Sequence, residues 1–315
     1  MYSLIEMLSY KRPEGTATQR DFCKRFLEPS FGLPDIHGNY VMQIGSKPRL
    51  CFTAHHDTVH NTEGTQKLVV MNDVVSVADQ TASNCLGADC TTGVYVLLSM
   101  IDAGISGTYV VHAAEEIGCK GSSALVQDNP EWLDYTDAVI SFDRYGDKSV
   151  ITHQMGMRTC SDEFAKSFAD AVSMPQLKGD DGGSYTDSNE YASIVSECTN
   201  ISVGYYNQHG KNETQDLVYL DKLVDNLITA DWSKIVISRD PSVVDDLYSY
   251  NYNEYFVDEY NTKEVDAMED FIGQYAHEVA TLLTEYGFTI DAMAEELHLS
   301  ESSFINNYAR RRMWG

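Results

Sequence analysis

The chain has 315 residues, of which 43% are hydrophobic and 22% charged. These values are ordinary for a globular protein and exclude a collagen-like, low-complexity or wholly disordered chain. Its 22 Lys and Arg residues against 48 Asp and Glu residues give a formal net charge of −26, a field that repels phosphate backbones and anionic lipids and so argues against nucleic acid or a membrane surface as the main partner.

The first elements predicted along the chain are short amphipathic helices at residues 3–7 and 18–27, separated by Pro13-Glu14-Gly15. An alternating strand pattern follows at residues 40–44. No window approaches the roughly 20 consecutive apolar residues of a membrane span, and the first residues lack the basic and then apolar layout of a signal peptide. Together with seven cysteines that show no CxxC spacing, these features predict a cytoplasmic protein with reduced thiols.

Four apolar stretches then predict buried strands, at residues 50–54, 109–113, 138–142 and 201–205. A helix with one apolar face fits residues 92–103, between the first two strands. Strands that alternate with helices indicate a mainly parallel sheet that is covered on both faces. We therefore expect an α/β fold.

The composition changes near residue 240, because residues 240–315 hold 16 acidic and 4 basic residues and begin with a crowd of tyrosines. We predict a main domain at residues 1–238, an acidic, tyrosine-rich connector at 239–264 and a helical C-terminal extension at 265–315. The extension has the spacing of a DNA-binding helix-turn-helix and ends in Arg310-Arg311-Arg312. A helical hairpin for packing or oligomerisation is the simpler interpretation, since the turn lacks glycine.

Residue types that commonly bind metals follow each predicted strand. Ligands bind at the carboxyl ends of the strands in open α/β sheets, so these side chains are expected to gather at one edge. Two histidines with Asp and Glu form a donor set that suits Zn²⁺, or Mn²⁺ and Co²⁺, better than a thiolate site does. The residues are His55, His56 and Asp57 after the first strand, Glu115 and Glu116 after the second, Asp143 after the third and His209 after the fourth, with Asp89 ahead of the predicted helix.

This set contains one carboxylate more than a metal site needs. A metal-assisted hydrolase has a use for it, because a nearby base must take a proton from the attacking water. Neighbouring Glu115 and Glu116 cannot share one face of an extended strand, so one can bind metal while the other faces the water. Asp57 could accept the second ring N–H of His55 and fix its tautomer.

In their order along the chain, these segments resemble the metal motifs of the co-catalytic di-zinc exopeptidases, which are the aminopeptidases of the M28 and M42 types and the related M20 peptidases. The resemblance covers about residues 1–238. Only 65 residues separate Asp143 from His209, too few for the dimerisation domain of the M20 enzymes, so the M28-like form fits better. The motifs are His55-His56-Asp57-Thr58-Val59, Gly87-Ala88-Asp89, Glu115-Glu116-Ile117-Gly118, Ser141-Phe142-Asp143 and His209.

The resemblance implies a three-layer α/β/α sandwich with a mixed, mostly parallel sheet and an active site that holds two Zn²⁺ ions. It also implies that one aspartate bridges the two ions. By position, the resemblance assigns His55, Asp89 and Asp143 to one zinc, Glu116, Asp89 and His209 to the other, the role of general base to Glu115 and the orientation of His55 to Asp57.

The chain departs from the family pattern at Cys90, where these peptidases commonly carry a second acidic residue after the bridging aspartate. Arg144, directly after Asp143, is a candidate for binding a substrate carboxylate or for a structural role. Four further histidines match no family position and are expected to form local hydrogen bonds: His56, His60, His112 and His153.

The function predicted from these residues is that of a metal-dependent exopeptidase, an aminopeptidase whose acidic surroundings suit a cationic amino terminus. A carboxypeptidase or a deacylase of small amides would use the same metal chemistry with a different pocket. A regulatory or DNA-binding protein that uses the C-terminal helices is the alternative from another class, and the net charge speaks against it. The expected partners are a peptide or small amide substrate and a second copy of the chain, bound through the C-terminal region.

Overall fold

A computed structural model describes residues 3–243, 272, 275–276 and 279–280 of the chain. The chain divides into two compact units, residues 1–249 and 250–315, and the elements below belong to the first. The predicted acidic connector beyond residue 243 and the predicted helical extension lie outside the described residues, apart from those single positions.

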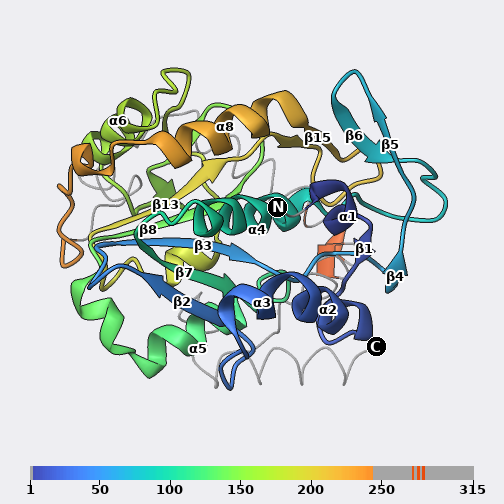
Figure 1. The fold of residues 1–315 in the computed structure, drawn as a ribbon, viewed down its shortest axis with the longest axis horizontal. Coiled ribbons are helices and arrows are strands. Elements are labelled where there is room, and N and C mark those ends of the chain that lie inside the picture. Colours follow the sequence, from blue (N-terminus) through green and yellow to red (C-terminus); the bar gives the residue numbers. More distant parts are fainter. Residues whose placement is uncertain (1–2, 244–271, 273–274, 277–278, 281–315) are drawn as a thin grey trace, which may run out of the picture. The chain divides into compact units, whose positions relative to one another are not determined.

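The first unit is built on a seven-stranded sheet (Figure 1). Neighbouring strands are parallel in four pairs, β12–β9, β13–β8, β8–β3 and β3–β7, whereas β13–β9 and β7–β2 are antiparallel. The sheet is therefore mixed and mostly parallel, as predicted. Its order is β12 (Lys178–Asp180), β9 (Ser149–Ile151), β13 (Glu197–Ser202), β8 (Ala138–Arg144), β3 (Leu50–His55), β7 (Gly107–His112) and β2 (Tyr40–Ile44).

Helices cover both faces of this sheet, which gives the predicted three layers. On one face, α4 (Ala88–Asp102) packs on β3 and β8, and α8 (Leu217–Thr229) packs on α4. On the other face, α7 (Asp187–Glu190) contacts β3, β8 and β13 and is covered by α5 (Lys120–Asp128). Figure 1 shows α4 and α8 on one side of the strands and α5 on the other.

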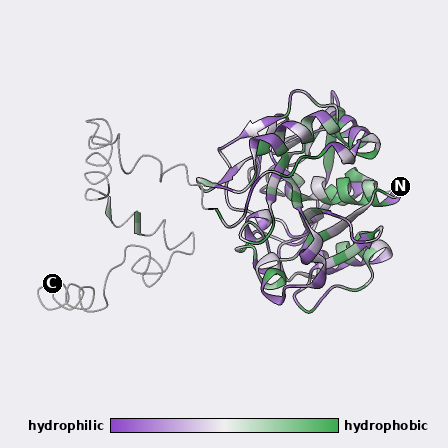
Figure 2. Ribbon diagram, turned by 90° about the vertical axis from the view of Figure 1, so that its left-hand side faces the viewer, coloured by the Kyte–Doolittle hydropathy of each residue, from purple (hydrophilic) through white to green (hydrophobic). Residues whose placement is uncertain are grey.

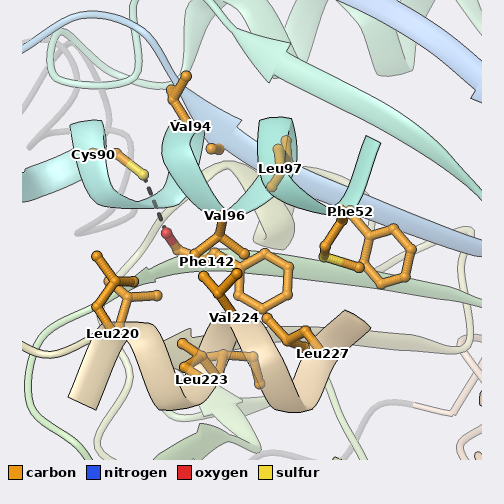
Figure 3. Close-up of a cluster of buried hydrophobic side chains, with 14 of the residues drawn as sticks. Phe52, Cys90, Val94, Val96, Leu97, Phe142, Leu220, Leu223, Val224 and Leu227 are labelled. Carbon is orange, nitrogen blue, oxygen red and sulfur yellow. Dashed lines mark hydrogen bonds between the residues drawn. The ribbon is translucent and has the colours of Figure 1, made fainter. Parts of the chain in front are cut away.

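The strands alternate between two hydrophobic cores, as expected when successive side chains point to opposite faces. Phe52 and Phe142 join the core beneath α4 and α8, where Leu223 and Leu227 meet them (Figure 3). Cys51, one residue before Phe52, joins the second core on the opposite face. Both faces of the sheet are therefore covered by hydrophobic side chains, which explains why the sequences of the strands are nearly continuous apolar runs.

The N-terminal segment differs from the prediction of one helix at residues 18–27. It forms α1 (Leu4–Leu8), α2 (Ala17–Phe22), a π-helical turn η1 (Cys23–Leu27) and α3 (Glu28–Phe31). The side chain of Thr16 caps α2 by accepting the N–H of Gln19. Phe22 and Phe26, four residues apart and so on one side of the helical segment, both face Tyr10 in an aromatic cluster.

A second, four-stranded sheet lies beside the first and was not predicted. Its order is β14 (Tyr205–Tyr206), β15 (Thr214–Asp216), β6 (Val74–Val77) and β5 (Leu68–Met71). The predicted strand at 201–205 is thereby split, because β13 ends at Ser202 and β14 starts at Tyr205. The loop from β14 to β15 carries His209, so this sheet fixes the position of a predicted metal ligand.

The remaining elements are short. Figure 2 shows hydrophobic segments that recur along the helices and strands of the first unit between hydrophilic ones. Within the described part of the chain, none of the helices combines the length and apolar character needed to cross a membrane. The remaining short elements are β1 (Tyr10–Lys11), β4 (Gly64–Thr65), β10 (His153–Gln154), β11 (Met157–Arg158), α6 (Asp162–Ala171), η2 (Glu131–Tyr135) and η3 (Trp232–Lys234).

Candidate metal centre

The predicted site residues meet at the carboxyl ends of the central strands. His55 is the last residue of β3, Asp143 lies near the end of β8, and Glu115 and Glu116 follow β7. Asp89 stands in the first turn of α4. With His209, the four acidic residues among these line one cavity of about 110 Å³.

The first cluster forms around His55, which is almost fully buried. Its Nε2 atom lies 3.1 Å from Oδ1 of Asp89 and 3.4 Å from Oδ1 of Asp143. Burial opposes the charge on His55, but Asp143 and neighbouring groups outweigh it and raise its pKa well above the usual value. A cation is therefore favoured where these oxygens converge.

The second cluster forms around His209, whose Nε2 atom lies 3.1 Å from Oδ2 of Asp89 and 3.3 Å from Oε2 of Glu116. Hydrogen bonds to Asp89 and Glu116 raise the pKa of His209 to about 11. Asp89 thus turns one carboxylate oxygen toward each histidine. Burial opposes its ionisation, but the bonds to His209 and His55 hold its pKa well below the usual range. The carboxylate stands between the clusters, where a bridging ligand would stand.

The other carboxylates of the cavity are held close together and away from water. Burial, reinforced by the charge of Asp89, raises the pKa of Glu116 and of Asp143 to about 7. Burial also raises the pKa of Glu115 to about 8, and its Oε2 atom lies 3.9 Å from Nε2 of His55. Four carboxylates in one cavity repel one another when they are ionised, and bound cations would offset this repulsion. Glu115 stands beside the clusters with the basicity that a proton acceptor near neutral pH needs.

Asp57 connects the two halves of the site. Its side chain is fully buried, its Oδ1 atom lies 3.3 Å from Nδ1 of His55, and its two oxygens accept the backbone N–H groups of Glu115 and Glu116 at 3.2 and 3.0 Å. Burial opposes its ionisation, but hydrogen bonding to His55 and the charges of both neighbouring histidines lower its pKa. Asp57 therefore stands where it can orient His55, as predicted, and it also positions the Glu115-Glu116 pair, which was not predicted.

The residues fit divalent metal ions. Two buried carboxylate oxygens of the clusters have no hydrogen-bond partner in the described structure, Oε1 of Glu116 and Oδ1 of Asp143. Unpaired buried polar atoms are costly, and coordination would satisfy the two carboxylate oxygens. Ligand atoms of His55, Asp89 and Glu116 all lie within 4.8 Å of one another. Nitrogen and carboxylate oxygen donors suit zinc, manganese or cobalt.

Cys90, which stands where the family commonly carries an acidic residue, lies next to the metal centre. Its thiol is within the same 4.8 Å reach of His55 and Asp143, but it donates to the carbonyl oxygen of Phe142 at 3.2 Å (Figure 3). Burial raises the pKa of this thiol well above its usual value. Cys90 therefore lies beside the ligands, with its thiol bonded to the backbone of β8.

Two residues that the sequence analysis did not select support the ligands. The hydroxyl of Thr186 donates to Oδ2 of Asp143 at 3.0 Å. The carboxylate of Glu213 is buried and accepts the four successive backbone N–H groups of residues 86–89 at 2.8 to 3.2 Å. These N–H groups at the start of α4 have no partner within the helix. Glu213 therefore joins the loop of His209 to the turn that carries Asp89.

The four histidines outside the family pattern are buried and do not line the cavity. Each lies within hydrogen-bond distance of a neighbour, as predicted, and so makes local contacts that support the fold. The ring contacts are His56 with Gln19 and the Gly38 carbonyl, His60 with Thr58, His112 with Tyr191 and Asn39, and His153 with Thr152.

A sequence comparison relates part of the chain to a known peptidase family. Residues 39–191 match the sequence model of peptidase family M28, and no curated protein matches the chain. The family match confirms the predicted resemblance to M28-type peptidases, and with it the class of metal-dependent hydrolases.

Among solved structures, aminopeptidase PepT from Bacillus cereus is similar with a TM-score of 0.58 and 15% identity over 72% of this chain and 95% of its own. A tripeptidase from Staphylococcus aureus gives 0.57 and 13%, over 72% and 95%. The TET1 peptidase of Pyrococcus horikoshii, which can assemble into a tetrahedron or a large octahedral shell, gives 0.55 and 16%, over 73% and 100%. These likenesses confirm the α/β fold.

Proposed function

We propose that this chain, whose residues 39–191 match the model of peptidase family M28, is an aminopeptidase that uses two divalent metal ions. The nature of the donors favours zinc. The observation that carries this proposal is the position of Asp89, which offers one oxygen to the His55 cluster and the other to the His209 cluster. His55, Asp89 and Asp143 would hold one ion, and His209, Asp89 and Glu116 the other.

When bound, two such ions supply Lewis acidity toward the scissile carbonyl and lower the pKa of water. The side chains of the protein would transfer the proton and hold the reacting groups in position. Glu115 accepts a proton at its carboxylate and returns it to the leaving amine nitrogen. Asp57 keeps His55 oriented and holds the backbone of Glu115 in place. Burial of these groups strengthens each electrostatic contact.

Selectivity for amino termini is supported by the negative charge of the chain, which is −26 in total and favours a substrate with a cationic amino terminus. A carboxypeptidase or deacylase would need a different arrangement of charge around the scissile bond. The names of PepT, the tripeptidase and TET1 favour the aminopeptidase among these alternatives.

The test is mass spectrometry of a mixed peptide library incubated with zinc-loaded protein, using matched peptides with free and acetylated amino termini. Stepwise loss of amino-terminal residues from the free set alone is expected. Loss of carboxyl-terminal residues would establish the carboxypeptidase instead, and intact peptides in both sets would overturn the proposal in favour of small amides or the C-terminal region.

We also propose a cytoplasmic location and self-association. All seven cysteines are free and buried, which suits a reducing compartment. The ability of TET1 to form shells favours assembly, and the tyrosine-rich connector is the candidate contact. Light scattering of the chain with and without the residues after 240 tests this proposal. An unchanged oligomeric state would place the contact in the main domain, for which we propose residues 1–238.

A further inference from the structure

Arg144 lies in the wall of the cavity beside the metal centre. It follows Asp143 at the end of β8, and it is the only Lys or Arg among the described residues that line this cavity. Its side chain is 10% exposed. A guanidinium that is buried to this degree is costly unless other groups offset its charge.

The contacts of Arg144 offset that charge only in part. Its Nη2 atom donates to the carbonyl oxygen of Gly182 at 3.0 Å and to the hydroxyl of Tyr145 at 3.3 Å, and both acceptors are neutral. The guanidinium also lies 4.2 Å from the centre of the Tyr145 ring. Its Nε atom is buried without any hydrogen-bond partner in the described structure. An N–H donor of the fork is therefore left unpaired.

The nearest acidic partner outside the metal centre is Asp180, 3.7 Å from Nη2. Its carboxylate already accepts hydrogen bonds from the hydroxyl of Ser149 and the N–H of Gly182, and it makes no hydrogen bond to Arg144. The pair is therefore an ion pair at a distance rather than a bidentate contact. A second carboxylate is needed to complete the surroundings of the guanidinium.

The carboxylates of Asp89, Glu116 and Asp143 would bind the metal ions and so would not pair with Arg144. The carboxylate of Glu115 would serve as the base of the proposed reaction. With that centre filled, as the proposed function requires, Arg144 is the cationic group that faces the remaining space. The cavity is small, about 110 Å³ in volume before any ion is bound. It admits a short group of a substrate.

We propose that Arg144 binds a carboxylate of the substrate and so sets the substrate class of this aminopeptidase. This inference rests on the proposed function and names its specificity. The carboxylate has two sources with the same chemistry. It is either the free carboxyl terminus of a very short peptide or the acidic side chain of an Asp or Glu residue. In both cases a planar guanidinium suits a planar carboxylate better than a lysine would.

The experiment measures peptide binding without turnover, by calorimetric titration of the zinc-loaded Glu115→Gln variant. The first pair of ligands is alanyl-alanine and its carboxyl-terminal amide, and the second is glutamyl-alanine amide and glutaminyl-alanine amide. Each pair differs in one carboxylate. Binding of the carboxylate member about tenfold more tightly is expected in at least one pair, because a charge-assisted hydrogen bond is gained.

Adding Arg144→Gln to this background is expected to abolish that preference while the neutral peptides bind as before. Arg158→Gln is the matched control, since Arg158 also donates to a backbone carbonyl but lies outside the cavity, and it should keep the preference. Arg144→Lys should retain part of it if Arg144→Gln fails to fold.

Equal binding within both pairs, or a preference that survives Arg144→Gln, would overturn the proposal. The first pair and the second pair separate the two sources of the carboxylate. Failure of the proposed aminopeptidase activity is detected separately, because wild-type protein would then leave the neutral amides uncleaved whatever the binding of the carboxylates.

Discussion

Glu213 offers a sharp test of how the site is assembled. Each of the two oxygens of its carboxylate accepts two backbone N–H groups, so that all four N–H groups of residues 86–89 are bonded. Burial raises the pKa of Glu213 to about 7, so at about pH 8 the group is ionised, as four N–H donors require. The substitution Glu213→Gln keeps the shape but turns an NH₂ group toward two of the donors.

The magnitude follows from the two N–H groups that lose their acceptor. Each buried, unsatisfied donor costs about 1–3 kcal/mol, so the free energy of unfolding should fall by about 2–6 kcal/mol at pH 8. Because the same turn carries Asp89, zinc affinity should fall as well, by about 10- to 100-fold, the usual effect of removing a residue that supports a ligand.

Urea unfolding and competition with a zinc chelator measure the two effects. The matched control is Glu63→Gln, because the exposed carboxylate of Glu63 accepts the N–H of Thr18 and does not line the cavity. This variant should leave zinc affinity unchanged. Wild-type stability together with wild-type zinc affinity in Glu213→Gln would refute the reasoning. A loss of stability alone would show that Glu213 supports the helix but not the ligand.

Three further predictions concern the site and the core. Glu115→Gln should lower kcat by about 10²–10⁴-fold while two equivalents of zinc stay bound, and near-normal turnover would sink the assignment of the base. Asp89→Ala should weaken both zinc ions together in a calorimetric titration, whereas two ions retained at full affinity would exclude a bridge. Burial lowers the pKa of His112 to about 3, against about 6.5 in an unfolded chain. The unfolded state therefore takes up a proton that the folded state refuses, and the unfolding free energy of metal-free protein should fall as the pH drops below about 6.5. His112→Gln should flatten this acid loss in urea unfolding, and an unchanged pH profile would contradict it.

Much of the site was predictable because two local rules act together. Apolar runs at residues 50–54, 109–113 and 138–142 predict buried parallel strands, and such strands end at one edge of a sheet. His55, the glutamate pair and Asp143 follow directly. His209 follows the fourth predicted strand and Asp89 precedes the predicted helix, and the family resemblance then assigned these residues to the two ions. The structure brings these residues together in the two expected clusters.

The parts that could not be predicted depend on contacts between distant segments. Glu213 bonds to backbone groups about 125 residues earlier in the chain, and nothing in its own neighbourhood signals that contact. The hydroxyl of Thr186 reaches Asp143, which lies 43 residues earlier in the chain, in the same way. The sheet that positions His209 is made of strands of two to four residues, too short for a periodic pattern to show.

The central claim is that Asp89 bridges two metal ions between His55 and His209. A crystal structure of the zinc-loaded protein, with anomalous scattering measured at the zinc edge, tests it most directly. The account predicts two peaks, one about 2.0–2.2 Å from donor atoms of His55 and Asp143, and the other at that distance from His209 and Glu116, with both bound to Asp89. A single peak, or two peaks that do not share Asp89, would contradict the account.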